Sequence, residues 1–188
     1  GQGGFSRVFL AEDLECHNRR VAAKICRAET HEVRTLANIQ HSGVGPVFYT
    51  REIADQGLVA ICMPVISRTT LDAVRRDVWA RSQNLLRNSV PTNCRLVWQV
   101  LAAQQEPKPK RPKWVGMSFV DWVLQVAIRA VQALGEAHQQ GIIHCDVKPS
   151  NILITREGFP VLIDFNVAFR SDANASPGNA GGTIPYMA

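Results

Sequence analysis

The chain has 188 residues, of which 46% are hydrophobic and 20% charged, a composition typical of globular proteins that argues against intrinsic disorder. No apolar run approaches the roughly 18 residues that a membrane-spanning helix needs. The net charge is +5, but residues 75–113 hold nine Lys or Arg and only two Asp or Glu, and the rest of the chain is slightly acidic. One segment is basic rather than the whole domain, so no nucleic-acid partner is expected.

The first third of the chain has the pattern of short strands. Stretches rich in Val, Ile and Phe predict strands at residues 5–11, 20–26, 46–51 and 58–63. Between the second and third strands, the spacing of Val33, Leu36 and Ile39 predicts a short helix over residues 30–40 with one apolar face.

The middle of the chain has the pattern of helices. Residues 75–101 could form one or two amphipathic helices, and the proline-spaced basic run 107–113 is typical of an exposed, extended linker. Residues 118–140 carry the strongest helix signal, with Ser118 and Asp121 as a capping box. Polar residues recur there every three or four positions, so we expect a narrow polar stripe facing solvent and a broad buried apolar face.

Two short apolar strands, residues 151–154 and 161–163, follow this helix and are joined by a turn at Glu157 and Gly158. Residues 170–182 are mostly small or polar, which is typical of a mobile surface loop. The five cysteines are odd in number and form no CxxC pair. This argues against a disulfide framework or a zinc site and favours a reducing compartment.

Two N-terminal features suit phosphate binding. The glycines of GQGGFSRV, residues 1–8, let backbone amides approach a phosphate closely. Lys24 ends the apolar strand VAAK, where its ammonium group could bind phosphate oxygens and be held by a carboxylate. Taken alone, each feature has a plainer interpretation: an ordinary glycine turn, and a surface lysine whose stem covers apolar surface.

The sequence HCDVKPSN, residues 144–151, and Asp164 at the end of an apolar strand contain the groups that phosphoryl transfer needs. Asp146 could orient an attacking hydroxyl and accept its proton, and Lys148 could offset charge on the transferred group. Asn151 and Asp164 offer the oxygen ligands that Mg²⁺ prefers.

These segments occur in the order GQGGFSRV, VAAK, HCDVKPSN, DFN and, at residues 182–188, GTIPYMA. With these motifs in this order, the chain resembles a eukaryotic-type (Hanks-type) bacterial serine/threonine protein kinase domain. The resemblance implies an α+β, protein-kinase-like bilobal fold, with a small β-rich N-lobe and a helical C-lobe that is incomplete here.

The resemblance also implies a division of the chain. The parts would be an N-lobe without its first strand (1–63), a hinge region (64–74), a basic insert with Pro and Trp (75–117), and the C-lobe as far as the activation loop (118–188). We expect a fragment truncated at both ends, inactive by itself and exposing apolar surface. In the insert, Trp79, Trp98 and Trp114 would either anchor it to the larger lobe, which we favour, or form a docking surface.

Individual residues take roles from the same resemblance. The catalytic residues would be Asp146 as base, Lys148 on the γ-phosphate, and Lys24 on the α- and β-phosphates with Glu32 as its partner. ATP would be bound by Gly1, Gly3, Gly4, Val8, Ala22, Lys24, Met63 and Leu153, with Met63 at the gatekeeper position. Asn151 and Asp164 would hold Mg²⁺. Leu36, Val47, His144 and Phe165 would stack as a spine linking the two lobes.

The implied function is transfer of the γ-phosphoryl group of ATP to serine or threonine hydroxyls of a protein substrate. Lys148, two residues after Asp146, and Thr183 in GTIPYMA are typical of the serine/threonine class. The implied location of the kinase domain is the cytoplasm, with a membrane tether outside the chain as an option, and the oligomeric state stays open.

Two alternatives remain at this point. A pseudokinase, which binds nucleotide as a scaffold, is suggested by Cys145 in place of the usual Arg, Asn166 in place of the usual Gly, and the short link from Lys24 to Glu32. That short link also makes Glu29 an alternative partner for Lys24. A small-molecule kinase is disfavoured by the segment GTIPYMA.

Overall fold

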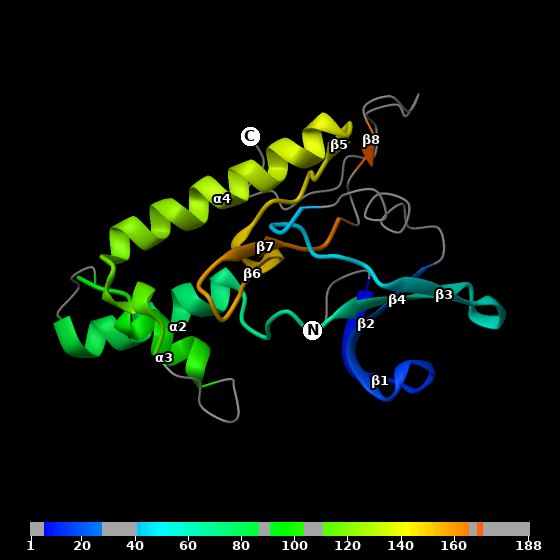
Figure 1. The fold of residues 1–188 in the computed structure, drawn as a ribbon, viewed down its shortest axis with the longest axis horizontal. Coiled ribbons are helices and arrows are strands. Elements are labelled where there is room, and N and C mark those ends of the chain that lie inside the picture. Colours follow the sequence, from blue (N-terminus) through cyan, green and yellow to red (C-terminus); the bar gives the residue numbers. More distant parts are fainter. Residues whose placement is uncertain (1–5, 28–40, 87–90, 104–110, 166–168, 171–188) are drawn as a thin grey trace.

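The computed structural model describes residues 6–27, 41–86, 91–103, 111–165 and 169–170. Its N-terminal part is a four-stranded antiparallel sheet in the order β1-β2-β4-β3 (Figure 1). The strands are β1 (Ser6–Asp13), β2 (Arg19–Arg27), β3 (Tyr49–Ile53) and β4 (Leu58–Pro64). All four predicted strands are confirmed, with shifts of a few residues at their ends. The helix predicted over residues 30–40 lies outside the described residues.

The register of this sheet places a set of predicted site residues on one face. Val8 pairs with Lys24 across β1 and β2, and Ala22 pairs with Met63 across β2 and β4. Directly opposed residues share a face, and so do residues two apart on one strand. Val8, Ala22, Lys24 and Met63 therefore lie on the same face of the sheet. It is the face that also carries the buried cluster Cys26, Val59 and Ile61.

Helices and short strands form the second part of the molecule (Figure 1). The helices are α2 (Leu71–Leu86), α3 (Arg95–Ala102) and α4 (Phe119–Gln139), and the strands are β5 (Ile142–Ile143), β6 (Ile152–Ile154), β7 (Pro160–Leu162) and β8 (Phe169–Arg170). β6 pairs with β7 and β5 pairs with β8, both antiparallel. The whole is the α+β arrangement that the resemblance implies, with a β-rich part beside a helical one.

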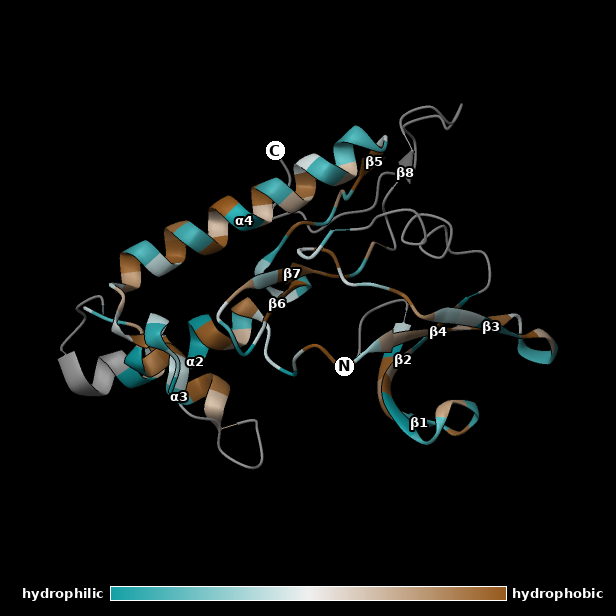
Figure 2. Ribbon diagram, viewed as in Figure 1, coloured by the Kyte–Doolittle hydropathy of each residue, from teal (hydrophilic) through white to brown (hydrophobic). Residues whose placement is uncertain are grey.

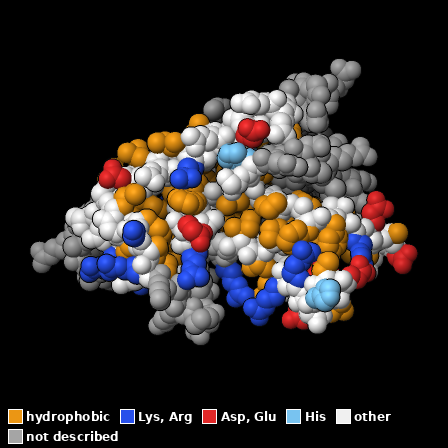
Figure 3. Space-filling view, in the orientation of Figure 1, with side chains coloured by type: hydrophobic (Ala, Val, Ile, Leu, Met, Phe, Trp, Pro, Cys, Tyr) orange, Lys and Arg blue, Asp and Glu red, His pale blue; other side chains and the backbone are white. Residues whose placement is uncertain are grey.

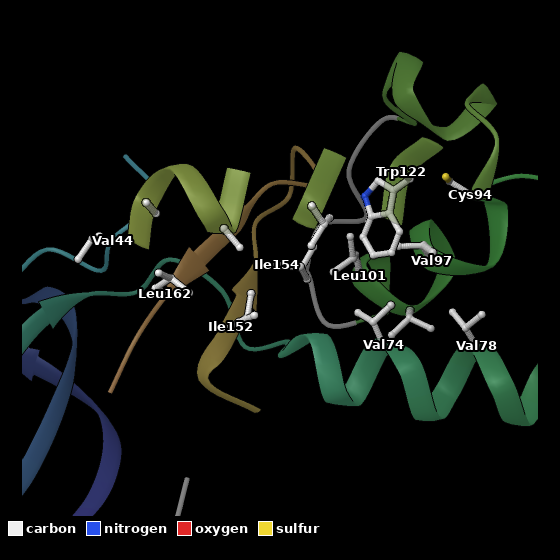
Figure 4. Packing of buried hydrophobic residues seen from close by; sticks show 14 of the residues in the cluster. Val44, Val74, Val78, Cys94, Val97, Leu101, Trp122, Ile152, Ile154 and Leu162 are labelled. Atoms are coloured by element: carbon white, nitrogen blue, oxygen red, sulfur yellow. The ribbon is translucent and has the colours of Figure 1, made fainter. Parts of the chain in front are cut away.

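The main apolar core lies between α2, α3, α4 and the β6–β7 hairpin. Val74 and Val78 from α2, Leu101 from α3 and Trp122 from α4 all belong to this buried cluster (Figure 4). Ile152 and Leu162 extend it toward the sheet, where Val44 forms a parallel bridge to Leu162. The core therefore holds the β6–β7 hairpin, and with it the segments that flank the candidate site.

Helix α4 confirms the capping prediction but contradicts the prediction of a broad buried face. The Ser118 side chain accepts a hydrogen bond from the Asp121 backbone N–H at 3.0 Å. Only one arc of the helix is buried: Trp122, Val126, Ala130, Ala133 and Ala137. A second apolar arc is exposed: Val120, Val123, Leu124, Ile128 and Val131. Hydrophobic positions recur along α4 in Figure 2, and Figure 3 shows hydrophobic side chains at the surface along this helix. The described elements contact α4 on one side only, which confirms the expected apolar surface.

The predicted basic insert begins inside a helix. Helix α2 runs through residue 75, so the predicted boundary between hinge region and insert does not coincide with the end of an element. α2 and α3 confirm the prediction of one or two helices in this region. Among the described residues, no helix combines the length and apolar character needed to cross a membrane.

Two tryptophans of the insert, Trp98 and Trp114, pack against the larger part. Trp114 stacks on Trp122 of α4 with ring centroids 6.4 Å apart, and it meets the edge of Trp98 at 6.3 Å. Trp122 donates from Nε1 to the carbonyl of Gly158, in the turn of the β6–β7 hairpin, at 3.1 Å. Trp98 and Trp114 therefore pack as we favoured, whereas Trp79 is exposed.

Candidate active site

The segment after α4 is held by a buried histidine. His144 is almost fully buried, and its Nδ1 accepts from the backbone N–H of Asp146 at 3.3 Å. With Nδ1 as acceptor, Nε2 carries the proton and donates to the carbonyl of Ile163 at 3.1 Å. Burial lowers the pKa of His144 against the opposing effect of the Ile163 carbonyl, which favours the neutral ring. His144 thereby connects residue 146 to the end of β7.

Asp146 lies at the centre of a polar cluster. Lys148 Nζ is 2.7 Å from Asp146 Oδ2. The side-chain amide of Asn151 donates to both the backbone oxygen of Asp146, at 2.9 Å, and its Oδ2, at 3.0 Å. Asn151 is buried, so this amide fixes the orientation of the Asp146 carboxylate. The structure brings together three of the predicted site residues here, and all come from one short segment.

A second ion pair joins the sheet to the segment after β7. Lys24 Nζ is 2.9 Å from Asp164 Oδ1, although the two residues are 140 positions apart in sequence. Lys24 is 4% exposed, so its charge is compensated inside the molecule rather than by water. Asp164 has a φ of 69°, a left-handed backbone conformation that costs energy in a residue other than glycine. This conformation occurs where the chain leaves β7.

Three residues of the predicted spine are described, and one of them, Val47, contacts both parts of the molecule. The rings of His144 and Phe165 are 4.3 Å apart, and both side chains are buried. Val47 packs against the main core and also against the cluster on the sheet. Leu36, the fourth residue predicted for the spine, lies outside the described residues.

The described residues predicted to bind ATP come from both parts of the molecule. Val8, Ala22 and Met63 share the Lys24 face of the sheet, as the register requires. Leu153 lies on β6 and forms a bridge with Thr70, the residue before α2. The remaining predicted site residues, Gly1, Gly3, Gly4 and Glu32, lie outside the described residues, as do Glu29, Asn166 and Thr183.

Backbone hydrogen bonds also hold the segments around the site, and the sequence analysis did not predict them. The loop before β3 is bonded to β7, with Gly45 N–H donating to the Leu162 carbonyl and Leu162 N–H to the Gly43 carbonyl, both at 2.8 Å. Cys145 has a φ of 61°, and its thiol lies 3.5 Å from the Ile143 carbonyl. No side-chain pattern marks such backbone groups. The glycines at 43 and 45 were the one available signal.

The side chains fit a magnesium ion. Because the Asn151 amide nitrogen donates to Asp146, any cation would meet the oxygen end of this amide. Asp164 adds a carboxylate next to the buried Lys24. Among the described residues, no group of three or more His, Cys, Asp or Glu gathers around one point. The oxygen atoms of Asn151 and Asp164 suit Mg²⁺, which usually takes one or two carboxylates together with substrate phosphates.

Comparison with known proteins finds similarity to protein kinases. Residues 117–188 match the protein kinase domain family. The chain is 31% identical over 179 residues to the serine/threonine-protein kinase PknB of Mycobacterium tuberculosis, which covers 89% of this chain and 23% of PknB. It is 27% identical to PknD of Chlamydia trachomatis and 25% to PknD of Protochlamydia amoebophila, each over 89% of this chain and 16% and 15% of those proteins. The chain thus spans less than a quarter of the length of these curated relatives.

Proposed function

We propose that this chain, a Hanks-type bacterial protein kinase domain, belongs to a kinase that transfers the γ-phosphoryl group of ATP to serine or threonine hydroxyls of proteins. The observation that carries the proposal is the pairing of two polar clusters. Asp146, Lys148 and Asn151 form one cluster, and Lys24 with Asp164 forms the other. His144 joins them, because it bonds to the backbone at 146 and at 163.

Each cluster supports a distinct task in the reaction. The Asp146 carboxylate, held by the Asn151 amide, would orient the acceptor hydroxyl and take its proton. Lys148, 2.7 Å from that carboxylate, would place a positive charge beside the transferred group. Lys24 would bind phosphate oxygens and hold Asp164 in position, and Asn151 and Asp164 would hold the metal. ATP with Mg²⁺, when bound, supplies the phosphoryl group and neutralises part of its charge.

The test is phosphoryl transfer by the full-length parent protein. We expect the parent to move label from γ-labelled ATP with Mg²⁺ to serine or threonine of a generic protein acceptor. The variant Asp146→Ala should lose this activity by at least about a hundredfold, because the general base contributes roughly that much. Asp55→Ala, an exposed aspartate between β3 and β4, is the matched control and should keep full activity.

Two results would contradict the proposal. Label that persists in Asp146→Ala would show that Asp146 is not the base. A parent protein that binds ATP but transfers no label would be a nucleotide-binding scaffold, and transfer to small molecules alone would make it a small-molecule kinase.

The proposal extends to where the reaction takes place. We place the kinase domain in the cytoplasm, where ATP is available, and allow for a membrane tether in the parent outside this chain. None of the five cysteines forms a disulfide, which suits a reducing compartment. The chain alone should be inactive, because α4 leaves an apolar arc uncovered. Fractionation of cells that express the tagged parent, followed by a kinase assay of each fraction, tests the location. A kinase assay of the chain alone tests its inactivity.

A further inference from the structure

Helix α2 presents a stripe of charged and aromatic residues on its outer side. Asp72, Arg75, Arg76 and Trp79 are spaced i, i+3, i+4 and i+7, which places them along one face of a helix. Val74 and Val78 point the other way, into the main core. We call these four residues the α2 surface. Figure 3 shows Lys and Arg side chains over the end of the molecule that carries α2 and α3.

Trp79 is the unusual member of this surface. It is 58% exposed, whereas Trp98 and Trp122 are buried and Trp114 is half-buried. Tryptophan and arginine are the residues most enriched at the energetic centres of protein interfaces. Here one exposed Trp lies one turn beyond two arginines, so the composition is that of an interface centre.

Arg75 and Arg76 each use only part of their guanidinium group toward Asp72, which leaves N–H donors that a partner's carboxylate could bind. Arg75 uses Nη2 toward Asp72 at 2.9 Å, and Arg76 uses Nε toward the other Asp72 oxygen at 3.0 Å. Their side chains are 62% and 66% exposed, which leaves the rest of each guanidinium group accessible. A guanidinium held in place on one edge is preorganised for a second carboxylate on another edge.

We propose that the α2 surface docks an acidic segment of a partner polypeptide that carries a large apolar side chain next to its carboxylates. The carboxylates would bind Arg75 and Arg76, and the apolar side chain would cover Trp79. A nucleic acid fits less well, because Asp72 pairs with both arginines and leaves the stripe with a net charge of only +1. A membrane fits less well, because Trp79 is the only large apolar side chain in the stripe. The proposal concerns binding and does not depend on the proposed function.

The experiment measures binding of the chain to an array of synthetic peptides that combine Glu with Leu or Phe. Arrays with Lys in place of Glu, and with Glu but no apolar residue, serve as comparisons. We expect the acidic peptides with an apolar residue to bind, and binding to weaken as salt rises. Trp79→Ala should weaken it about tenfold or more, as at an interface hot spot. Arg75→Glu with Arg76→Glu should abolish it.

Asp72→Asn is expected to strengthen peptide binding, whereas the other variants weaken it. It releases both arginines, so the same peptides should bind about two- to fivefold more tightly at low salt, the range of an exposed ion pair. Matched controls are Leu14→Ala, which removes another exposed apolar side chain, and Arg20→Glu with Arg156→Glu, which makes the same charge change elsewhere. Neither control should alter binding.

Several outcomes would overturn the proposal. Failure of every acidic peptide to bind would do so, as would binding that Trp79→Ala leaves unchanged. Tighter binding of a single-stranded oligonucleotide or of anionic lipid vesicles, lost in the same variants, would assign the surface to nucleic acid or membrane instead.

Discussion

Asn151 controls the local geometry around Asp146. Its buried amide donates two hydrogen bonds to one residue, at 2.9 and 3.0 Å. Asn151→Ala removes both and leaves the Asp146 carboxylate less well satisfied, so we expect a loss of about 1–3 kcal/mol in the free energy of unfolding. Urea denaturation of the chain measures this loss. Ser150→Ala, at the exposed neighbouring position, should be nearly neutral, and an equal loss in both variants would contradict the role of the amide.

Cys94 gives a pH dependence of stability. Burial, with a smaller effect of the Asp121 charge, raises the pKa of the Cys94 thiol from 9.0 to about 11. Between these two values the unfolded chain loses the thiol proton and the folded chain keeps it, so the stability that Cys94 contributes is present below pH 9 and is lost as pH rises toward 11. In urea denaturation from pH 8 to 11, the free energy of unfolding should decline less steeply with pH for Cys94→Ala than for the unsubstituted chain. Identical slopes would contradict the shifted pKa.

At the scale of elements, the β6–β7 turn depends on a glycine that faces Trp114. Gly158 has a φ of +83°, and a Cβ atom there would lie 2.9 Å from Trp114 Cε2. Gly158→Ala should therefore combine backbone strain of about 1–2 kcal/mol with overpacking of about 1–3 kcal/mol. Gly57→Ala, with a φ of +61° and open space around the new Cβ, should cost only the strain. Thermal unfolding of both variants measures the difference, and equal costs would contradict the contact with Trp114.

The two stacked tryptophans differ in their hydrogen bonding. Trp122 donates to the Gly158 carbonyl, whereas the buried Nε1 of Trp114 has no partner among the described residues. Trp122→Phe leaves that carbonyl without its donor, so it should cost about 1–3 kcal/mol more than Trp114→Phe, in which no hydrogen bond is lost. Chemical denaturation of both variants tests this. A larger cost for Trp114→Phe would mean that packing volume outweighs hydrogen bonding at this junction.

For the whole molecule, the exposed apolar arc of α4 sets the solution behaviour of the chain. Large contiguous apolar patches are rare on soluble monomers and usually mark an interface. We expect the chain to self-associate, and the combined variant Val123→Gln, Leu124→Gln and Val131→Gln to be more monomeric in sedimentation velocity. Leu14→Gln, a change at an exposed apolar residue of the other part, should leave association unchanged. If the unsubstituted chain is monomeric, this expectation is wrong.

Much of the fold and the candidate site could be predicted from local patterns. Stretches rich in Val, Ile and Phe indicated the four strands of the sheet, and Ser118 with Asp121 indicated where α4 begins. The segment HCDVKPSN indicated the cluster around Asp146, because its members are at most five residues apart. These features depend on hydrogen bonds and spacing within a few residues, which the sequence states directly.

What only the tertiary structure decided depends on contacts between distant residues. The 2.9 Å pair of Lys24 and Asp164 needs the sheet to lie against the end of β7. The broad apolar face predicted for α4 is buried along one arc only, because burial depends on which elements pack there and not on helical periodicity. The same holds for the insert, where Trp98 and Trp114 pack against the larger part and Trp79 faces solvent. A sequence records which side chains are apolar, whereas the pairing of surfaces is a property of the assembled chain.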